Sequence, residues 1–239
     1  MGVAESVLEA LEMRYLSDKE PQHLTIMHTT GIGAVTKYGL NRLAHDGLIK
    51  RVIGGNFGLQ LPFMKDLIVS NRIEAYNFPQ GVLSQLMRRV AGGHCGMLSR
   101  IGLGTFVDPH NDGGKLNSIT TEDLVTRVAI DGHENLYYRI PPPDVAIVRG
   151  TTSDELGNLT MEYEAGWFEM LSQATAASNH GGEVIAQVAR VVSAKSLDPR
   201  QVKVPAHLVS AIVVDESQPQ TLVEQFNPYY CGEDRWEDP

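Results

Sequence analysis

Short runs of apolar, often β-branched residues recur along the chain, and most of them end at or just before a glycine. We interpret the following runs as strands: 24–30, 51–53, 73–78, 97–101, 145–149, 184–192 and 208–215. Nearly continuous apolar runs of this length are typical of strands in a sheet that is covered on both faces. The glycines that follow them predict tight turns at the strand ends.

Between these runs, apolar residues recur at helical spacing. The pattern predicts helices at 4–16, 40–48, 61–70, 82–90, 121–128 and 165–179. The helix at 121–128 is also favoured by Glu122 and Asp123, because acidic residues in a first turn interact well with the helix dipole. The repeated order of strand, glycine turn and helix predicts an α/β fold, with an open, mostly parallel sheet and helices on both faces.

Length and composition indicate a globular protein with one large domain or two small ones. The chain has 239 residues, of which 42% are apolar and 21% are charged. We expect one domain over residues 1–232, followed by an acidic segment at 233–239 that is a loose tail or a linker.

The charge balance and the apolar runs exclude several classes of partner. Twenty basic against 29 acidic side chains give a net charge of −9, which disfavours binding to a nucleic-acid backbone. The apolar runs are far shorter than the roughly 20 residues of a membrane span, and the N-terminus does not resemble a signal peptide. Cys95 and Cys231 match no disulfide or zinc spacing. We therefore expect a cytoplasmic protein with no nucleic-acid or membrane partner.

Conventional catalytic motifs, such as a Walker A run, GxSxG or HExxH, do not occur. Cys95 lies between His94 and a glycine, which is compatible with a thiol hydrolase. Neighbouring residues in a strand or turn point apart, however, so His94 is poorly placed as a base and a structural cysteine is favoured. The histidines, His28 included, form no metal-ligand cluster and are interpreted as structural. Glu162 and Glu164 are interpreted as a solvated face rather than an acid and base pair.

The glycine turns are the most informative candidates. Because the carboxyl ends of parallel strands lie at one edge of a sheet, ligands of such folds bind there. Backbone amides in glycine turns suit an anion such as a phosphate or a thioester oxyanion. The segments 79–81, 102–109 and 113–117 add a side-chain amide, a hydroxyl and a cation. The alternative is that these glycines only close tight turns.

Seven segments resemble, in order and spacing, the first half of family I coenzyme A transferases. They are IGGNFGLQ, YNFPQGVLSQLMR, GLGTFVDP, GGKLN, RGTTSDELGNLTMEYEA, GGEVIAQV and SLDPRQVKVPAHLV. The resemblance extends from residue 2 to about residue 232 and is closest to the long single-chain branch, whose substrates are acetate, propionate and 3-keto acids. GLGTFVDP together with GGKLN is its most specific part.

This resemblance implies two similar α/β halves with the active site between them. In the family, a glutamate of the second half attacks the acyl-CoA thioester and then carries CoA as a glutamyl thioester, with ping-pong kinetics. Coenzyme A is therefore a substrate, and no cofactor is expected. The implied partners are an acyl-CoA, a short carboxylic acid, and either a β-type half or a second copy of the chain.

The sequence departs from the family pattern at both ends. The E-x-G turn with the nucleophilic glutamate belongs to the second half, so no residue of this chain is assigned as catalytic. Of the opening glycine signature only residues 2–5 match, with Ala4 where proline is usual. We therefore expect an α-subunit-like half, clipped at the front and inactive alone. The alternative is a non-catalytic acyl-CoA-binding or interaction subunit.

The resemblance assigns substrate-binding roles to several residues. Gln80 and Gly81 match the P-Q-G turn of the acyl pocket, and the run from Gly104 through Thr105 to Phe106 matches a second wall. Lys115 and Asn117 are expected either to hold their loop or to face the substrate. The remaining candidates are the glycines of two strand-end turns: Gly31, Gly33, Gly54 and Gly55.

Overall fold

The structure is a computed structural model that describes residues 2–33, 38–58, 61–221 and 224–235. The last two residues of IGGNFGLQ and the last four of the predicted tail therefore lie outside the described residues. The chain divides into two compact units: Met1–Leu8 with Pro142–Pro239, called unit 1, and Glu9–Pro141, called unit 2. The boundary falls within helix α1 (Glu5–Asp18).

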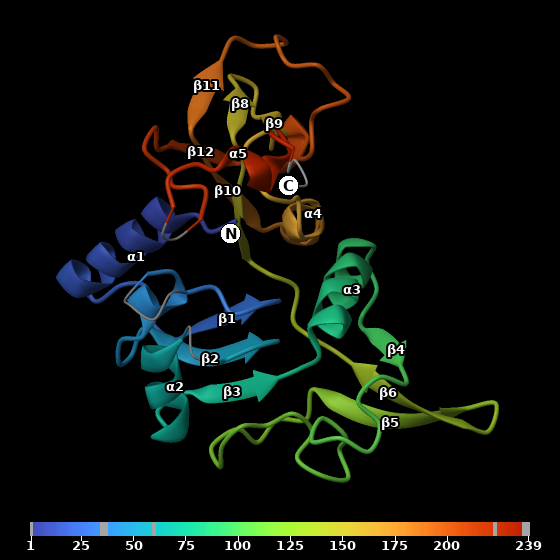
Figure 1. The fold of residues 1–239 in the computed structure, drawn as a ribbon. Helices are drawn as coiled ribbons and strands as arrows, with labels where there is room; N and C mark the ends of the chain where they lie inside the picture. Colours follow the sequence, from blue (N-terminus) through green and yellow to red (C-terminus); the bar gives the residue numbers. More distant parts are fainter. Residues whose placement is uncertain (1, 34–37, 59–60, 222–223, 236–239) are drawn as a thin grey trace. The chain divides into compact units, whose positions relative to one another are not determined.

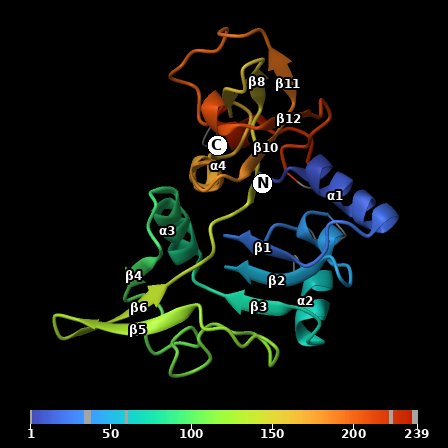
Figure 2. The ribbon, with the colours of Figure 1, turned by 180° about the vertical axis from the view of Figure 1, so that it is seen from behind.

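A parallel sheet of three strands forms the centre of unit 2. Its strands are β1 (Leu24–His28), β2 (Ile49–Gly54) and β3 (Glu74–Asn77), in the order β1-β2-β3. Their register aligns His28 with Gly54 and Gly54 with Asn77. The three carboxyl ends consequently share one edge, which Figures 1 and 2 show as the side on which the arrowheads lie. From this edge the chain runs directly from β3 into α3.

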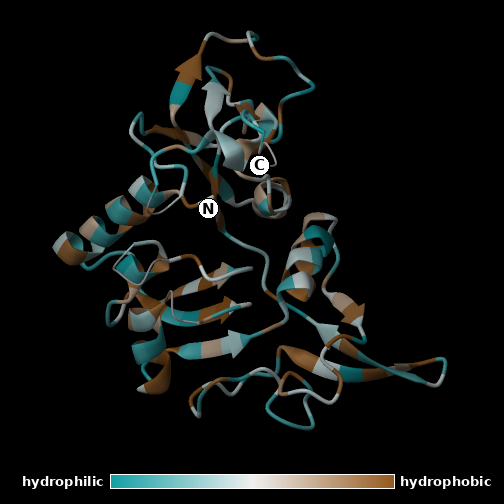
Figure 3. Cartoon of the chain, in the orientation of Figure 1, coloured by the Kyte–Doolittle hydropathy of each residue, from teal (hydrophilic) through white to brown (hydrophobic). Residues whose placement is uncertain are grey.

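The helices of unit 2 agree in part with the sequence pattern. They are the part of α1 from residue 9 onward, the 3-10 helix η1 (Leu40–Leu43), α2 (Pro62–Val69) and α3 (Gln80–Ala91). Helix α3 buries one apolar face, and Figure 3 shows hydrophobic and hydrophilic bands alternating along it. The predicted helix at 40–48 is shortened to η1, because the backbone leaves helical angles at Ala44, with φ −76° and ψ 58°.

The predicted helix at 121–128 is wrong, because this segment enters an antiparallel sheet. The strands are β4 (Met97–Ser99), β5 (Val125–Ile130) and β6 (His133–Tyr138), in the order β4-β6-β5. Asp131 and Gly132 join β5 to β6 with φ of 50° and 76°. Two consecutive positive φ angles are what a two-residue type I′ hairpin requires, so the turn favours strand pairing over a helix.

Unit 1 contains a second parallel sheet and a small mixed one. The parallel strands are β7 (Val145–Arg149), β10 (Glu183–Val188) and β12 (Ala211–Val214), in the order β12-β10-β7. The mixed sheet consists of β8 (Thr152–Asp154), β9 (Leu159–Thr160) and β11 (Arg190–Val192). The helices are α4 (Met170–Asn179), η2 (Ala206–Leu208) and α5 (Pro228–Cys231). The predicted strand at 184–192 is thus divided between β10 and β11.

The core of unit 1 lies where α4 packs against β7 and β10. It includes Ala174 from the helix and Val148, Val184 and Ala186 from the strands, all of which are buried. Parallel strands combined with helices confirm the predicted α/β class, although the parallel pairs are divided among three separate sheets rather than one. Within the described ranges, no helix is both long and apolar enough to cross a membrane.

Candidate functional site

Three turns meet at the carboxyl edge of the β1-β2-β3 sheet. Thr29 and Thr30 follow β1, Gly55 follows β2, and Phe78 with Pro79 joins β3 to Gln80, the first residue of α3. A Cβ at Gly55 would overlap the Thr29 carbonyl and the Gln80 side chain, so only glycine allows this approach. The Gln80 Nε2 donates a hydrogen bond of 3.3 Å to the Thr30 Oγ1. The turns therefore form one packed cluster, called the turn cluster below.

Helix α3 begins within the turn cluster. Pro79 precedes the helix with φ −57°, and Gln80 is its first residue. The first amides of a helix lack intrahelical acceptors and carry a partial positive charge, so they attract anions and carbonyl oxygens. Gln80 and Gly81 are exposed, and no atom lies within 4 Å of the position that a Cβ of Gly81 would occupy. The cluster thus presents amide donors to an approaching ligand.

His28, the last residue of β1, is buried beneath the turn cluster. Its Nδ1 lies 2.6 Å from the Thr30 carbonyl oxygen. Burial lowers the pKa of His28 to about 4, against the opposing effect of the Thr30 hydrogen bond, so the ring is neutral at pH 7. The Phe57 ring packs edge-on against it, with centroids 5.1 Å apart. The sequence identified His28 only as a structural residue.

The other strand-end glycines also lie close to this edge. Gly31 follows Thr30 directly, and Gly33 forms an isolated antiparallel bridge with Gly39. Gly54 is the last residue of β2, and its carbonyl accepts hydrogen bonds of 3.0 Å from the Phe78 amide and from the Asn77 side chain. The structure therefore brings Gly54, Gly55, Gln80 and Gly81 together, as the turn pattern indicated.

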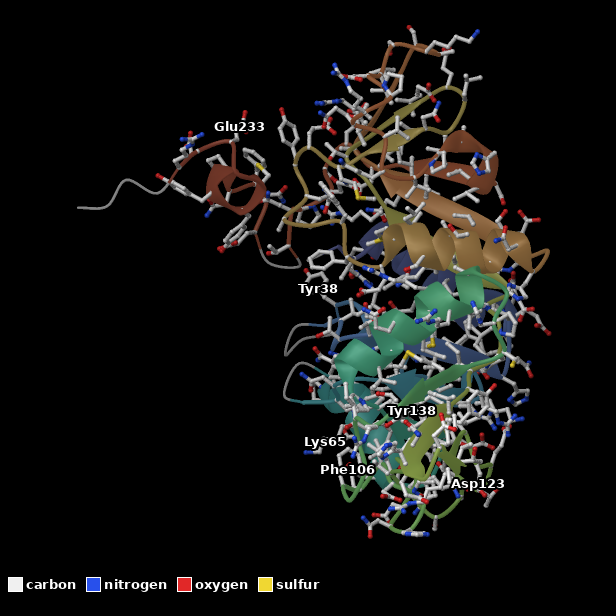
Figure 4. All side chains as sticks on the ribbon, turned by 90° about the vertical axis from the view of Figure 1, so that its right-hand side faces the viewer. Tyr38, Lys65, Phe106, Asp123, Tyr138 and Glu233 are labelled. Atoms are coloured by element: carbon white, nitrogen blue, oxygen red, sulfur yellow. The ribbon has the colours of Figure 1, made fainter. Side chains whose placement is uncertain are left out.

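The GLGTFVDP segment forms a loop that is organised around Asp108. This buried carboxylate accepts hydrogen bonds from the Gly104 amide at 2.7 Å and from the Arg127 guanidinium. The hydrogen bond from Arg127, followed by that from Gly104, holds the pKa of Asp108 far below its usual range. The Thr105 hydroxyl donates to the Gly102 carbonyl at 2.8 Å, whereas the Phe106 side chain is exposed at the edge of the loop (Figure 4).

The GGKLN segment extends the β1-β2-β3 sheet alongside β3. The Asn77 amide donates to the Gly114 carbonyl at 2.8 Å, and Lys115 forms an antiparallel bridge with Tyr76. The Gly114 amide also donates to the Phe106 carbonyl at 3.0 Å, which joins this segment to the GLGTFVDP loop. The Lys115 Nζ pairs with Asp123 at 2.5 Å. Its charge is therefore already matched by a carboxylate.

Asn117 lies at the other end of β3 from Gln80. Its Nδ2 donates to the carbonyls of Ile68 and Ile73, each at 2.8 Å, and Ile73 directly precedes β3. These hydrogen bonds anchor the GGKLN segment to the last turn of α2 and to the residue before β3. Lys115 and Asn117 are thus progressively farther along β3 from the turn cluster, and their contact with substrate stays a prediction.

The remaining sequence candidates are held by structural partners. Cys95 is exposed, and its Sγ accepts a hydrogen bond of 3.1 Å from the Tyr137 hydroxyl. The expectation of a solvated face is wrong for Glu164, which is buried and pairs with Arg149 at 2.9 Å. Glu162 pairs with Arg190 at 2.8 Å. The described residues contain no group of three or more side chains suited to a metal ion.

An open hollow of about 650 Å³ lies within unit 1. Its walls include Glu162, Glu164 and Trp167, and Lys203 places its Nζ 3.8 Å from the centroid of the Trp167 ring. The carboxylates are engaged in the pairs described above. We take the turn cluster as the candidate site, because it combines the exposed Gln80 side-chain amide with the first backbone amides of α3.

Comparison with known proteins connects this arrangement to a family. Residues 10–215 match the family model described as coenzyme A transferase. The acetate CoA-transferase YdiF of Escherichia coli O157:H7 is 42% identical over 217 residues, which cover 91% of this chain and 41% of that protein. The caffeate CoA-transferase of Acetobacterium woodii is 37% identical over 238 residues, which cover 97% of this chain and 45% of that protein.

A solved structure agrees with the sequence comparison. The acyl-CoA transferase YdiF of E. coli O157:H7, in a thioester complex with CoA, superposes with a TM-score of 0.95 and 39% identity. The match covers 100% of this chain and 47% of that chain. This chain thus spans less than half the length of the two relatives and of the solved structure named here.

Proposed function

This chain belongs to the coenzyme A transferase family, and we propose that it supplies the first half of an enzyme that transfers CoA between a short-chain acyl-CoA and a carboxylate. The acceptor would be acetate, propionate or a 3-keto acid. The coverage of the relatives supports a half-length role, since about half of each relative matches this chain.

The proposed reaction takes place on a glutamate of the second half. Its carboxylate attacks the thioester carbonyl, which gives an acyl-glutamyl anhydride and releases CoA thiolate. The thiolate then attacks the glutamyl carbonyl, releases the first carboxylate and leaves a glutamyl-CoA thioester. An acceptor carboxylate reverses both steps and departs as the new acyl-CoA. The thioester complex named for YdiF supports an intermediate of this type.

Our assignment of a role to this half rests on one observation, the position of Gln80 in the turn cluster. The Gln80 amide is exposed at the start of α3 and is anchored to Thr30 through one of its two N–H bonds. The second N–H is available to the oxygen that becomes negatively charged when a thioester carbonyl is attacked. The N-terminal backbone amides of α3 carry a partial positive charge, which would also stabilise this negatively charged oxygen.

Reconstitution tests this proposal. The chain alone, incubated with acetyl-CoA and propionate, is expected to form no propionyl-CoA, because the proposed nucleophile is absent from it. Adding a polypeptide that carries the second half should produce transfer and a CoA adduct on a glutamate of that half, detectable by mass spectrometry. Turnover by this chain alone, with an adduct on one of its own carboxylates, would contradict the proposal.

The range of acceptors that are used distinguishes a short-chain CoA-transferase from an enzyme for larger acids and from a non-catalytic subunit. The two relatives act, by name, on acetate and on caffeate, which differ greatly in size. We expect the reconstituted enzyme to use acetate and propionate with higher kcat/KM than caffeate. Binding of acyl-CoA without transfer to any acceptor, in the presence of the second half, would favour a non-catalytic subunit instead.

A further inference from the structure

The His28 ring has one defined tautomer. Its Nδ1 lies 2.6 Å from the Thr30 carbonyl oxygen, which can only accept a hydrogen bond. Nδ1 must therefore carry the proton, and Nε2 carries a lone pair. Nε2 is buried and has no hydrogen-bond partner within the described ranges. Among the described residues, the hydrogen bond of the ring is therefore the one that Nδ1 donates to the Thr30 carbonyl.

The ring is also fixed in position by its neighbours. His28 is paired in register with Gly54, and a Cβ at Gly54 would overlap both Nε2 and Cε1 of the ring. The Phe57 ring packs edge-on against the His28 ring, with an interplanar angle of 82°. With 2% of its surface exposed, the His28 side chain has little freedom to rotate away from Thr30.

A short chain of contacts connects His28 to Gln80. The ring holds the Thr30 carbonyl, and the hydroxyl of the same threonine accepts the hydrogen bond from the Gln80 Nε2. The stem of Gln80 packs against Gly55, beside the Thr29 carbonyl. The orientation of the Gln80 amide thus depends on where the Thr29–Thr30 turn is held.

Building on the proposed function, we propose that His28 is a positioning residue for transfer of CoA, acting through Thr30 to orient the Gln80 amide toward the thioester oxygen. It does not touch the substrate itself. Because Gln80 would act on charge that develops in the transition state, loss of this support lowers kcat more than it changes KM.

Two substitutions at His28 separate this role from simple packing. His28→Asn retains an N–H donor near the position of Nδ1, whereas His28→Leu keeps an apolar side chain and removes the donor. In the reconstituted enzyme, we expect His28→Leu to lower kcat about tenfold with KM for acetyl-CoA within about twofold. His28→Asn should recover most of that loss. His180→Leu is the matched control. The His180 Nδ1 also lies near a backbone carbonyl, at 2.8 Å from that of Ala176, but this pair belongs to α4 and its C-terminal end in unit 1.

The dependence on Gln80 is tested by combining variants. In a Gln80→Ala background, His28→Leu should cause no further loss of kcat, because the residue that it positions is already gone. Thermal melts of each variant measure its folded fraction, so that the kcat values are compared per folded enzyme. An unchanged kcat in His28→Leu, equal losses in the Leu and Asn variants, or losses that multiply in the double variant would each overturn the proposal.

A readout without turnover separates this proposal from the proposed function. The ¹H–¹⁵N resonances of the Gln80 side-chain amide should shift in His28→Leu and return toward wild type in His28→Asn. If the wild-type enzyme shows no CoA transfer, the proposed function fails, while these resonances still decide whether His28 positions Gln80. Unchanged Gln80 resonances in His28→Leu would overturn that positioning.

Discussion

Arg127 binds Asp108 through two parallel hydrogen bonds, from Nε to Oδ1 at 2.8 Å and from Nη2 to Oδ2 at 2.6 Å. The same carboxylate accepts the amides of Gly104 and His110. One buried acid therefore fixes both ends of the turn that carries Phe106. This geometry explains how a loop rich in glycine keeps a defined shape beside the GGKLN segment.

Removal of the Arg127 side chain should destabilise unit 2. Arg127→Gln leaves Asp108 buried with only its backbone donors, and we expect the melting temperature at pH 7 to fall by several degrees. Because the folded-state pKa of Asp108 is depressed, this stabilisation is complete above the ordinary carboxyl pKa and is lost as the pH falls toward the depressed value. The difference between wild type and variant should therefore shrink in acid.

The control for this measurement is Arg200→Gln. Arg200 pairs with Asp198 on the surface at 3.0 Å and is itself largely exposed, so its loss should leave the melting temperature nearly unchanged. Equal effects of the two substitutions would show that the Asp108 loop does not depend on Arg127.

A second ion pair should control the stability of unit 1. Arg149 and Glu164 are both buried, and Arg149 also donates to the Val3 carbonyl at 3.0 Å. Arg149→Met leaves the Glu164 carboxylate buried without its cation, and we expect a loss of about 3–5 kcal/mol in the free energy of unfolding. Urea denaturation measures this quantity. Arg190→Met, which removes the more exposed partner of Glu162, should cost at most about 1 kcal/mol.

Substitution of Gln80 tests the candidate site directly. In the reconstituted enzyme, Gln80→Ala should lower kcat/KM at least about tenfold, roughly 1.4 kcal/mol of transition-state stabilisation. The fold should remain intact, because the amide is exposed. Gln85→Ala, an exposed glutamine on the same helix, is the matched control. A Gln80 variant that loses thermal stability while its kcat/KM is unchanged would remove this residue from the site.

The buried His28 should make the stability of unit 2 depend on pH. Its pKa is about 4 in the folded state against 6.5 ordinarily, so only the unfolded chain takes up a proton between these values. Stability is therefore complete above pH 6.5 and declines as the pH falls to about 4, by roughly 3 kcal/mol in total. Urea denaturation at several pH values should show a shallower decline for His28→Leu. Parallel curves for the two proteins would contradict burial of a neutral ring.

Exposed aromatic residues predict that the chain associates with a partner or with itself. In unit 1 the exposed fractions are 59% for Trp167, 49% for Phe168 and 50% for Tyr229. Exposed apolar groups of this size are typical of interfaces. We expect light scattering to detect an oligomer, or a complex with the second half, at concentrations of roughly tens of micromolar. A monomer that persists in the presence of the second half would contradict this expectation.

Most strands of the parallel sheets could be predicted because they lie in short, mainly apolar runs that end near a glycine or proline turn. The segment that contains Val125 could not, because Glu122 and Asp123 imitate a helix start while the decisive signal lies later in the sequence. Asp131-Gly132 is a typical hairpin dipeptide, and it identifies β5 and β6 once the flanking apolar positions are read as strands.

The candidate site was predictable only in part, because some of its contacts join residues that are far apart in the sequence. A glycine turn after each parallel strand indicates one shared edge, and this placed Gly55 and Gln80 together. The contacts of His28 with Gly54 and Phe57 are set by packing of β1 against β2 and the residues that follow β2, which local sequence does not reveal. Asn117 follows the same rule: its hydrogen bonds to Ile68 and Ile73 cross more than forty positions of sequence.

Positions 28 and 54 occupy a single volume. The imidazole fills the space that any side chain at position 54 would need, so the two positions cannot both be large. A relative with alanine or serine at position 54 should therefore have a small residue at position 28, and with it another means of holding the turn after β1. The two positions are expected to change as a pair during divergence. Exchange of either residue alone between such relatives should lower stability, and exchange of both together should restore it.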